Sequence, residues 1–172
     1  MFTKINVLGI IKDQHRALAD YRTEKVEFRE IFTFYLLPAL IAAPLIVTNT
    51  YLNNDGVNTI ITILSIFVAL LLNVIVIIFD IIKEDEAGAS EIKKKLRLKL
   101  LREVFASSSF CILVSIAAIL FALLSRIDHC ITKLIFNWGT YWCLGVFLLN
   151  LLMIIKRLYG LLDVEFRDSL KE

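Results

Sequence analysis

Hydrophobic residues along the chain gather into four long runs that contain no charged residue. The runs cover residues 31–54, 57–79, 104–125 and 134–155. A bilayer core about 30 Å thick needs roughly 20 helical residues, and only a helix satisfies its own backbone polar groups within one segment in lipid. The pattern therefore predicts an all-α, polytopic membrane protein, a single domain over residues 1–172 with four transmembrane helices at about 31–52, 57–80, 104–125 and 134–156.

Two segments outside the runs also have helical periodicity. In the first 30 residues, apolar side chains recur at spacings of three, four or seven, at Val7, Leu8, Ile11, Leu18, Tyr21 and Phe28. This spacing predicts an amphipathic helix that lies on the membrane surface or packs on the rest of the cytoplasmic part. Between residues 80 and 103, we predict a helical hairpin, because the second span can continue through Glu86, Gly88 marks a turn and Ser90 favours a new helix start.

The distribution of basic residues sets the orientation. Of the 19 Lys and Arg residues, 17 lie in residues 1–30, 80–103 and 156–172, and the other two are Arg126 and Lys133. Because Lys and Arg retain adjoining segments on the cytoplasmic side, we expect these three segments and both termini in the cytoplasm. The chain is 58% hydrophobic, more than one small soluble core can bury. We therefore expect a multi-pass membrane protein.

Small and polar residues form one face on each of the last three spans. Such a face avoids lipid, either by packing on another helix, which is the commoner case, or by lining water. Four helices satisfy only some of these faces internally, so we expect a homo-oligomer. The faces, with members three, four or seven residues apart, are Asn58, Thr62, Ser65, Ala69, Asn73 and Asp80, then Ser107, Cys111, Ser115, Ala118 and Ala122, then Gly139, Cys143, Val146 and Asn150. From them we predict six helix-packing or pore-lining residues, namely Ser65, Asn73, Ser107, Cys111, Ser115 and Asn150.

The first span contains both prolines of the chain, Pro38 and Pro44. Each removes a backbone donor and clashes with the preceding turn, so this helix is expected to be bent or locally unwound. A static, packed kink is the commoner outcome, and a gating hinge is the alternative.

Aromatic residues cluster near the predicted ends of two spans. Trp138, Tyr141 and Trp142 fall near the external end of the fourth span, and Phe32 and Tyr35 fall near the cytoplasmic end of the first. Trp and Tyr are enriched where a membrane meets water, so these residues are interpreted as two interfacial belts.

The sequence offers little support for enzymatic chemistry. No span contains a deeply placed Asp, Glu, Lys, Arg or His that could serve acid-base or metal chemistry. The three cysteines, Cys111, Cys130 and Cys143, lack the spacing of a zinc site or a redox pair. Packing is their commoner role, and a Cys130–Cys143 disulfide near the external surface is the alternative. We expect no enzyme, no cofactor and no metal site.

A short stretch of the hairpin concentrates basic side chains. We predict it as a lipid- or partner-binding segment, with the membrane lipid or a cytoplasmic effector protein as partner. Retention of a loop on the cytoplasmic side explains these charges more simply than nucleic-acid binding does, so no direct contact with nucleic acid is expected. The residues are Lys93, Lys94, Lys95, Arg97 and Lys99.

In size, four-span topology and charged cytoplasmic ends, the chain resembles the small membrane subunits of bacterial antiphage defence systems, and in general plan the membrane subunit of the Kiwa system. The resemblance implies an inner-membrane oligomer that perceives infection and holds or activates a cytoplasmic, nucleic-acid-binding partner. The resemblance assigns no functional role to any particular residue. Two functions are therefore expected, with a slight preference for the first: a sensor or scaffold that docks a cytoplasmic effector through charged helices, or a pore-forming effector that depolarises the cell.

Overall fold

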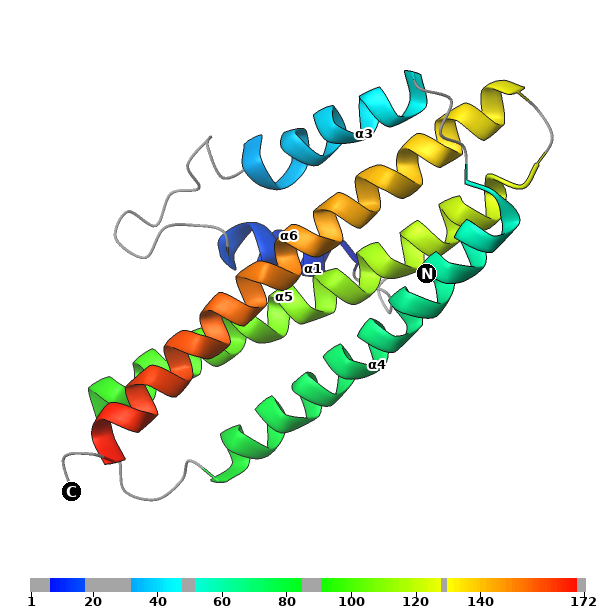
Figure 1. Cartoon of the computed structure of the whole chain (residues 1–172). Coiled ribbons are helices and arrows are strands. Elements are labelled where there is room, and N and C mark those ends of the chain that lie inside the picture. The colour runs from blue at the N-terminus through cyan, green and yellow to red at the C-terminus, as the bar shows by residue number, and fades with distance from the viewer. Residues whose placement is uncertain (1–6, 18–31, 48–51, 85–90, 128–129, 170–172) are drawn as a thin grey trace, which may run out of the picture.

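The computed structural model describes residues 7–17, 32–47, 52–84, 91–127 and 130–169 (Figure 1). Every regular element in these ranges is a helix, so the predicted all-α class is confirmed. The elements are α1 (Val7–Ala17), the π-helix η1 (Phe32–Leu36), α3 (Leu37–Val47), α4 (Asn54–Glu84), α5 (Glu91–Leu124) and α6 (Cys130–Ser169).

Three of these helices are long and apolar enough to cross a membrane, over Asn54–Ile82, Leu98–Leu124 and Ile131–Gly160. They match the second, third and fourth predicted spans. The first predicted span is shorter, because η1 and α3 contain 5 and 11 residues and rise about 24 Å, less than a core of roughly 30 Å. Residues 48–51 lie outside the described part, so the count of four spans stays a prediction.

The short helix is irregular where the sequence predicts it. Pro38 has no backbone N–H, so the carbonyl of Phe34, four residues earlier, has no α-helical donor. Phe34 lies within the π-helical turn η1, and α3 follows with Pro44 inside it. A widened turn is one of the ways in which a helix absorbs such a lost hydrogen bond.

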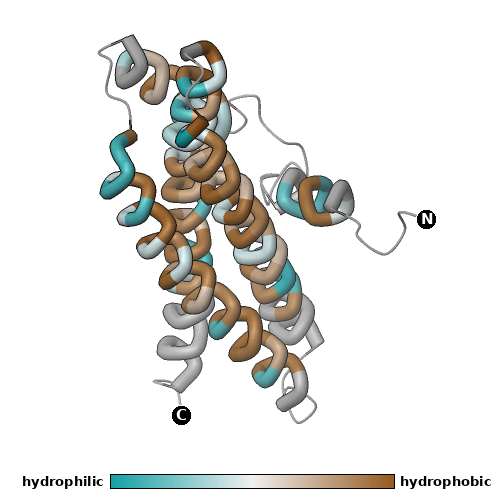
Figure 2. Tube along the Cα trace, turned by 90° about the vertical axis from the view of Figure 1, so that its right-hand side faces the viewer, coloured by the Kyte–Doolittle hydropathy of each residue, from teal (hydrophilic) through white to brown (hydrophobic). Residues whose placement is uncertain are grey.

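The membrane-length helices and α3 form an open row (Figure 1). Contacts run from α3 to α6, from α6 to α5 and from α5 to α4, whereas α3 and α4 do not touch within the residues that the structure describes. The helix α1 packs against α5 and lies across the long helices (Figure 2). The two edges of the row, α3 and α4, are therefore covered on one side only.

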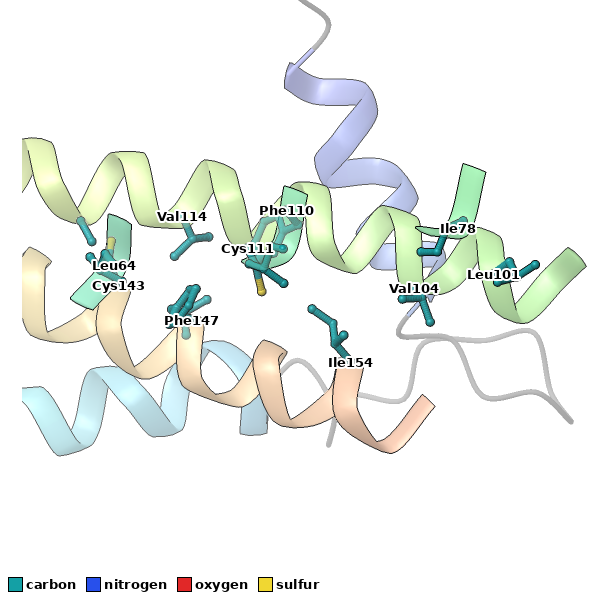
Figure 3. Packing of buried hydrophobic residues seen from close by; sticks show 13 residues of the cluster. Leu64, Ile78, Leu101, Val104, Phe110, Cys111, Val114, Cys143, Phe147 and Ile154 are labelled. Carbon is teal, nitrogen blue, oxygen red and sulfur yellow. The ribbon is translucent and has the colours of Figure 1, made fainter. Parts of the chain in front are cut away.

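The most extensive packing lies between α5 and α6. Figure 3 shows Val114 of α5 and Phe147 of α6 pointing toward one another. A Cβ added at Gly139 would lie 3.1 Å from the ring of Phe121, so the absence of a side chain lets the two helices approach closely. The helix α4 contributes Phe67, whose ring centroid lies 5.6 Å from that of Phe147. Because lipid is as apolar as these side chains, close packing rather than water exclusion holds such helices together.

The two ends of the row differ in chemistry. At one end, Asn53 caps α4 by accepting a hydrogen bond from the Gly56 amide at 2.7 Å, and Arg126 donates to Asn58 at 2.7 Å. At the other end, α4 and α6 finish and α5 begins, with Lys99, Arg102, Glu103, Lys156 and Arg157 beside the apolar stretches. We call this second end the charged end.

Two predicted extramembrane elements are seen in part. The hairpin prediction places helices on both sides of Gly88, and α4 ends at Glu84 while α5 begins at Glu91. Its turn, residues 85–90, lies outside the described residues. The N-terminal amphipathic helix also stays a prediction, because α1 covers only Val7–Ala17 of the first 30 residues.

Candidate functional site

A buried polar contact joins α1 to α6. The Gln14 amide donates from Nε2 to Asn150 Oδ1 at 2.5 Å, and the two side chains are 0% and 1% exposed. Asn150 in turn donates from Nδ2 to the Val146 carbonyl at 2.8 Å. The contact thus connects residues that are 136 positions apart in the chain, and Asn150 lies inside the apolar stretch of α6.

The position of Gln14 follows from the helical repeat of α1. It comes one turn after Ile10 and Ile11, which pack against the buried core, so the three side chains share a face. On the other side, Lys12 is exposed. The apolar face of α1 therefore brings one amide into the interior of the protein.

Two polar atoms near this junction lack a partner. Within the described part of the chain, Gln14 Oε1 and Ser108 Oγ are the buried side-chain oxygens without a hydrogen bond. A buried unsatisfied polar group costs about 1–3 kcal/mol. The unpaired oxygen of Gln14 therefore weakens the attachment of α1 to the long helices.

A second polar cluster joins α5 to α6 at the charged end. Arg157 donates from Nη1 to Ser107 Oγ at 2.8 Å and to the Glu103 carbonyl at 3.2 Å. Its Nε lies 3.6 Å from Glu103 Oε2, and both side chains are mostly shielded from solvent. One guanidinium therefore ties the start of the apolar stretch of α5 to α6.

An open pocket of about 410 Å³ lies between α1 and α5 at the charged end. Acidic and basic side chains alternate along its wall, and Phe105 and Ile10 supply apolar surface. The charged members are Asp13, Lys99, Arg102 and Glu103. Such a mixed wall can bind a peptide or a headgroup.

The structure offers no metal cage among the residues that it describes. No group of three His, Cys, Asp or Glu side chains comes together there. The expectation of a non-enzymatic protein without cofactor stays a prediction.

Four of the predicted packing residues meet between α5 and α6. Ser107, Cys111 and Ser115 are each 0% exposed, and Asn150 faces them from α6 as the partner of Gln14. The Ser115 hydroxyl donates to the Cys111 carbonyl at 2.8 Å, which satisfies it within its own helix. These residues therefore pack inside one chain and are not part of an outer surface.

The other two predicted packing residues lie elsewhere. Ser65 and Asn73 are exposed on the side of α4 that faces away from α5, whereas Leu64, Leu71 and Ile78 are buried on the opposite side. Within the described part of the chain, these two side chains do not pack on another helix. Packing between chains, or lining of a pore, stays a prediction for them.

The predicted basic segment is described only in part. The backbone of α5 carries Lys93, Lys94, Lys95 and Arg97, but their side chains lie outside what the structure describes. Lys99 is exposed and lines the pocket beside α1. The lipid- or partner-binding role of this segment stays a prediction.

The cysteine alternative is settled by helix geometry. Cys130 and Cys143 lie on the same helix, 13 residues apart, which separates them by about 20 Å, far beyond the roughly 7 Å between Cα atoms that a disulfide tolerates. Cys111 and Cys143 are buried free thiols. The packing interpretation therefore holds for these two cysteines.

Two of the expected belt residues lie together rather than at opposite membrane surfaces. The indole N–H of Trp142 donates to the Tyr35 carbonyl at 3.0 Å, and the Tyr35 ring contacts that of Phe110 at 6.5 Å between centroids. The belt prediction is wrong for Tyr35 and Trp142, because α3 is short and begins beside the middle of α5 and α6.

Sequence reasoning missed Gln14 and the Arg157–Glu103 pair. Gln14 lies three residues after Ile11 and four before Leu18, within the predicted apolar stripe, so a polar residue on that stripe was the available signal. Glu103 and Arg157 border two spans at the same predicted end of the protein, which was the signal for a cross-helix pair.

The chain matches no protein-family model, no curated protein and no solved structure.

Proposed function

We propose that this chain is a multi-pass subunit of the bacterial inner membrane that assembles into a homo-oligomer and acts as a sensor or scaffold. In this proposal, the charged end faces the cytoplasm, because 17 of the 19 Lys and Arg residues flank the spans on that side. A soluble effector docks there, on α1 and on the helices that extend past the apolar stretches. The pocket between α1 and α5 lies on the same surface.

The Gln14–Asn150 contact carries this proposal. Gln14 belongs to the N-terminal segment that we expect outside the membrane, and Asn150 lies within an apolar stretch, so one hydrogen bond connects the proposed docking surface to the membrane helices. A ligand that binds more tightly when α1 is attached also favours the arrangement of α6 that keeps Asn150 in place. By reciprocity, a change in the membrane helices alters the affinity for the effector.

Affinity purification from solubilised membranes tests the docking function. We compare the wild type with a variant that carries Lys93→Glu, Lys94→Glu and Lys95→Glu, and with Asn73→Leu. The wild type and Asn73→Leu are expected to retain a soluble effector encoded beside this gene, whereas charge reversal weakens its retention. Equal recovery with all three proteins contradicts docking through this segment. The orientation of the charge-reversed protein is checked first, since the substitutions also weaken the cytoplasmic retention signal.

The proposed trigger is phage infection, because the chain shares its general plan with the membrane subunits of antiphage systems. Cells that carry this gene with its neighbours are expected to give fewer plaques than cells that carry the neighbours alone. An unchanged plating efficiency over a broad phage panel removes the antiphage part of the proposal and leaves the docking function to its own test.

A pore is the second candidate, and the outward face of α4 favours it. Thr62 and Ser65 donate to carbonyls of their own helix, at 2.9 and 2.7 Å, but the exposed Asn73 amide lies in the middle of an apolar helix. If several chains place their α4 helices around one axis, this face lines the lumen. An apolar side chain at position 73 then favours dewetting and blocks ion flow.

Membrane potential separates the two functions. A voltage-sensitive dye is read in cells that express the wild type, Asn73→Leu or the charge-reversed protein at equal levels, before and after phage addition. The scaffold function predicts no depolarisation that depends on Asn73. Depolarisation that is lost in Asn73→Leu and kept after charge reversal supports the pore and refutes the scaffold.

A further inference from the structure

A second pocket lies between α4 and α5 near the charged end, and it shares Arg102 and Phe105 with the pocket beside α1. Its volume of about 630 Å³ falls in the range of about 300–1,000 Å³ that is typical of small-molecule sites. Of the lining residues that the structure describes, all are apolar except Arg102. The apolar wall includes Ile75, Val76, Phe79, Leu98, Leu101 and Phe105.

The groove exists because α4 and α5 diverge at this end. Among the described elements, α4 packs along α5 and makes no close backbone contact with α6. Val76 and Phe79 are 56% and 59% exposed, although they lie on a helix long and apolar enough to cross the membrane. The occupant of the groove must therefore present apolar surface to them.

Arg102 is the charged member among the described residues that line this groove. Its side chain is exposed and makes no hydrogen bond or ion pair with any residue that the structure describes. The nearby acids are engaged elsewhere, because Glu103 lies against Arg157 and Asp13 has an interaction of its own. The Arg102 guanidinium is therefore available at the mouth of an apolar groove, at the level where the apolar stretch of α5 begins.

We infer that this groove binds one anionic phospholipid, with an acyl chain along α4 and α5 and the phosphate on Arg102. Acyl chains match the apolar wall, and a planar guanidinium pairs with phosphate through two parallel hydrogen bonds. Basic pockets between membrane helices at the border with the headgroups are a known setting for anionic lipids. This proposal does not depend on the proposed effector.

Native mass spectrometry of the detergent-solubilised full chain tests the assignment, with phosphatidylglycerol and phosphatidylcholine supplied in equal amounts. The wild type is expected to retain phosphatidylglycerol preferentially. Arg102→Gln is expected to lower that preference about fivefold, the effect of one basic group at an anionic surface. Lys156→Gln removes an exposed charge at the same border but outside the groove, and it is expected to leave the preference unchanged. Equal losses in the two variants overturn the site.

A second pair of variants tests the groove without touching any charge. Val76 and Ile66 are 56% and 57% exposed on the same helix, and only Val76 lines the groove. Val76→Trp fills the space and is expected to reduce the bound phosphatidylglycerol, whereas Ile66→Trp is not. Retention of the lipid by both Trp variants overturns the proposal, even if Arg102→Gln fails to fold.

Discussion

The amide of Gln14 shows how a single side chain can fix the place of a whole helix. It is fully buried, its nitrogen bonds Asn150, and its own oxygen has no partner among the described residues. Burial of two polar groups that bond each other costs little free energy of folding. Burial of one of them without its hydrogen-bond partner costs much more.

Substitution of one or both members of this pair tests that asymmetry. Gln14→Leu and Asn150→Leu are each expected to destabilise the protein by about 1–2 kcal/mol. The first leaves Asn150 Oδ1, and the second leaves Gln14 Nε2, without its hydrogen-bond partner. The double variant is expected to be more stable than the sum of the two losses predicts. Thermal unfolding in detergent, followed by circular dichroism, measures all four proteins. Strictly additive losses contradict a direct contact between the two side chains.

Two serines allow a matched test of burial. Ser115 and Ser65 both donate to the carbonyl four residues earlier, at 2.8 and 2.7 Å, but Ser115 is fully buried and Ser65 is exposed. Ser115→Leu is expected to cost about 1–3 kcal/mol, because a larger side chain forces α5 and α6 apart. Ser65→Leu is expected to leave the folding of the single chain unchanged.

Unfolding and size-exclusion chromatography in the same detergent compare the two serine variants. A loss of stability at Ser65 equal to that at Ser115 rules out the outward orientation of this face of α4. A change confined to oligomer size in Ser65→Leu supports contact between chains.

At the scale of elements, the attachment of α3 depends on one glycine. A Cβ at Gly145 would lie 2.7 Å from the Cβ of Pro38, closer than atoms of packed side chains approach. Gly160, on the same helix, has open space where its Cβ would be. The two positions have the same residue type and opposite surroundings.

Gly145→Ala is therefore expected to displace α3 from α6, and Gly160→Ala to be neutral or stabilising, because Ala favours helix more than Gly by about 1 kcal/mol. Crosslinking between cysteines placed at Leu37 and Leu148, in a chain without native cysteines, measures the α3–α6 contact. Both residues line one pocket between the helices. Equal crosslinking in the two alanine variants excludes the tight approach at Pro38.

The sequence predicts the long helices well and their neighbours poorly. Apolar length and charge borders define α4, α5 and α6, because a helix in lipid must be apolar over its whole span. Spacing places Ser115 and Asn73 on polar or small faces, but it cannot say that one of these faces is buried and that the other meets no helix within the part of the chain that the structure describes. Which helices become neighbours depends on contacts such as Pro38 with Gly145, between residues far apart in sequence.

At the scale of the whole molecule, the charged end determines the expected orientation. Single cysteines are introduced at Asn54, Gly88 and Asp128 in a chain without native cysteines. An impermeant maleimide added to intact cells is expected to label positions 54 and 128 and to spare position 88. Labelling at position 88 reverses the proposed topology, and labelling in broken cells confirms that each cysteine is reactive.

The link between Tyr35 and Trp142 has a consequence for the order of biosynthesis. These residues are 107 positions apart in the chain, and Gln14 and Asn150 are 136 positions apart. At a synthesis rate of roughly 5–20 residues/s, the N-terminal segments leave the ribosome about 5–30 s before the helix that receives them. During that interval α3 has no contact with α4, the next helix to emerge. The first apolar segment therefore has to be held by the insertion machinery or by lipid until α6 is made, so translation that stops before α6 leaves α3 without its binding site and Gln14 of α1 without Asn150.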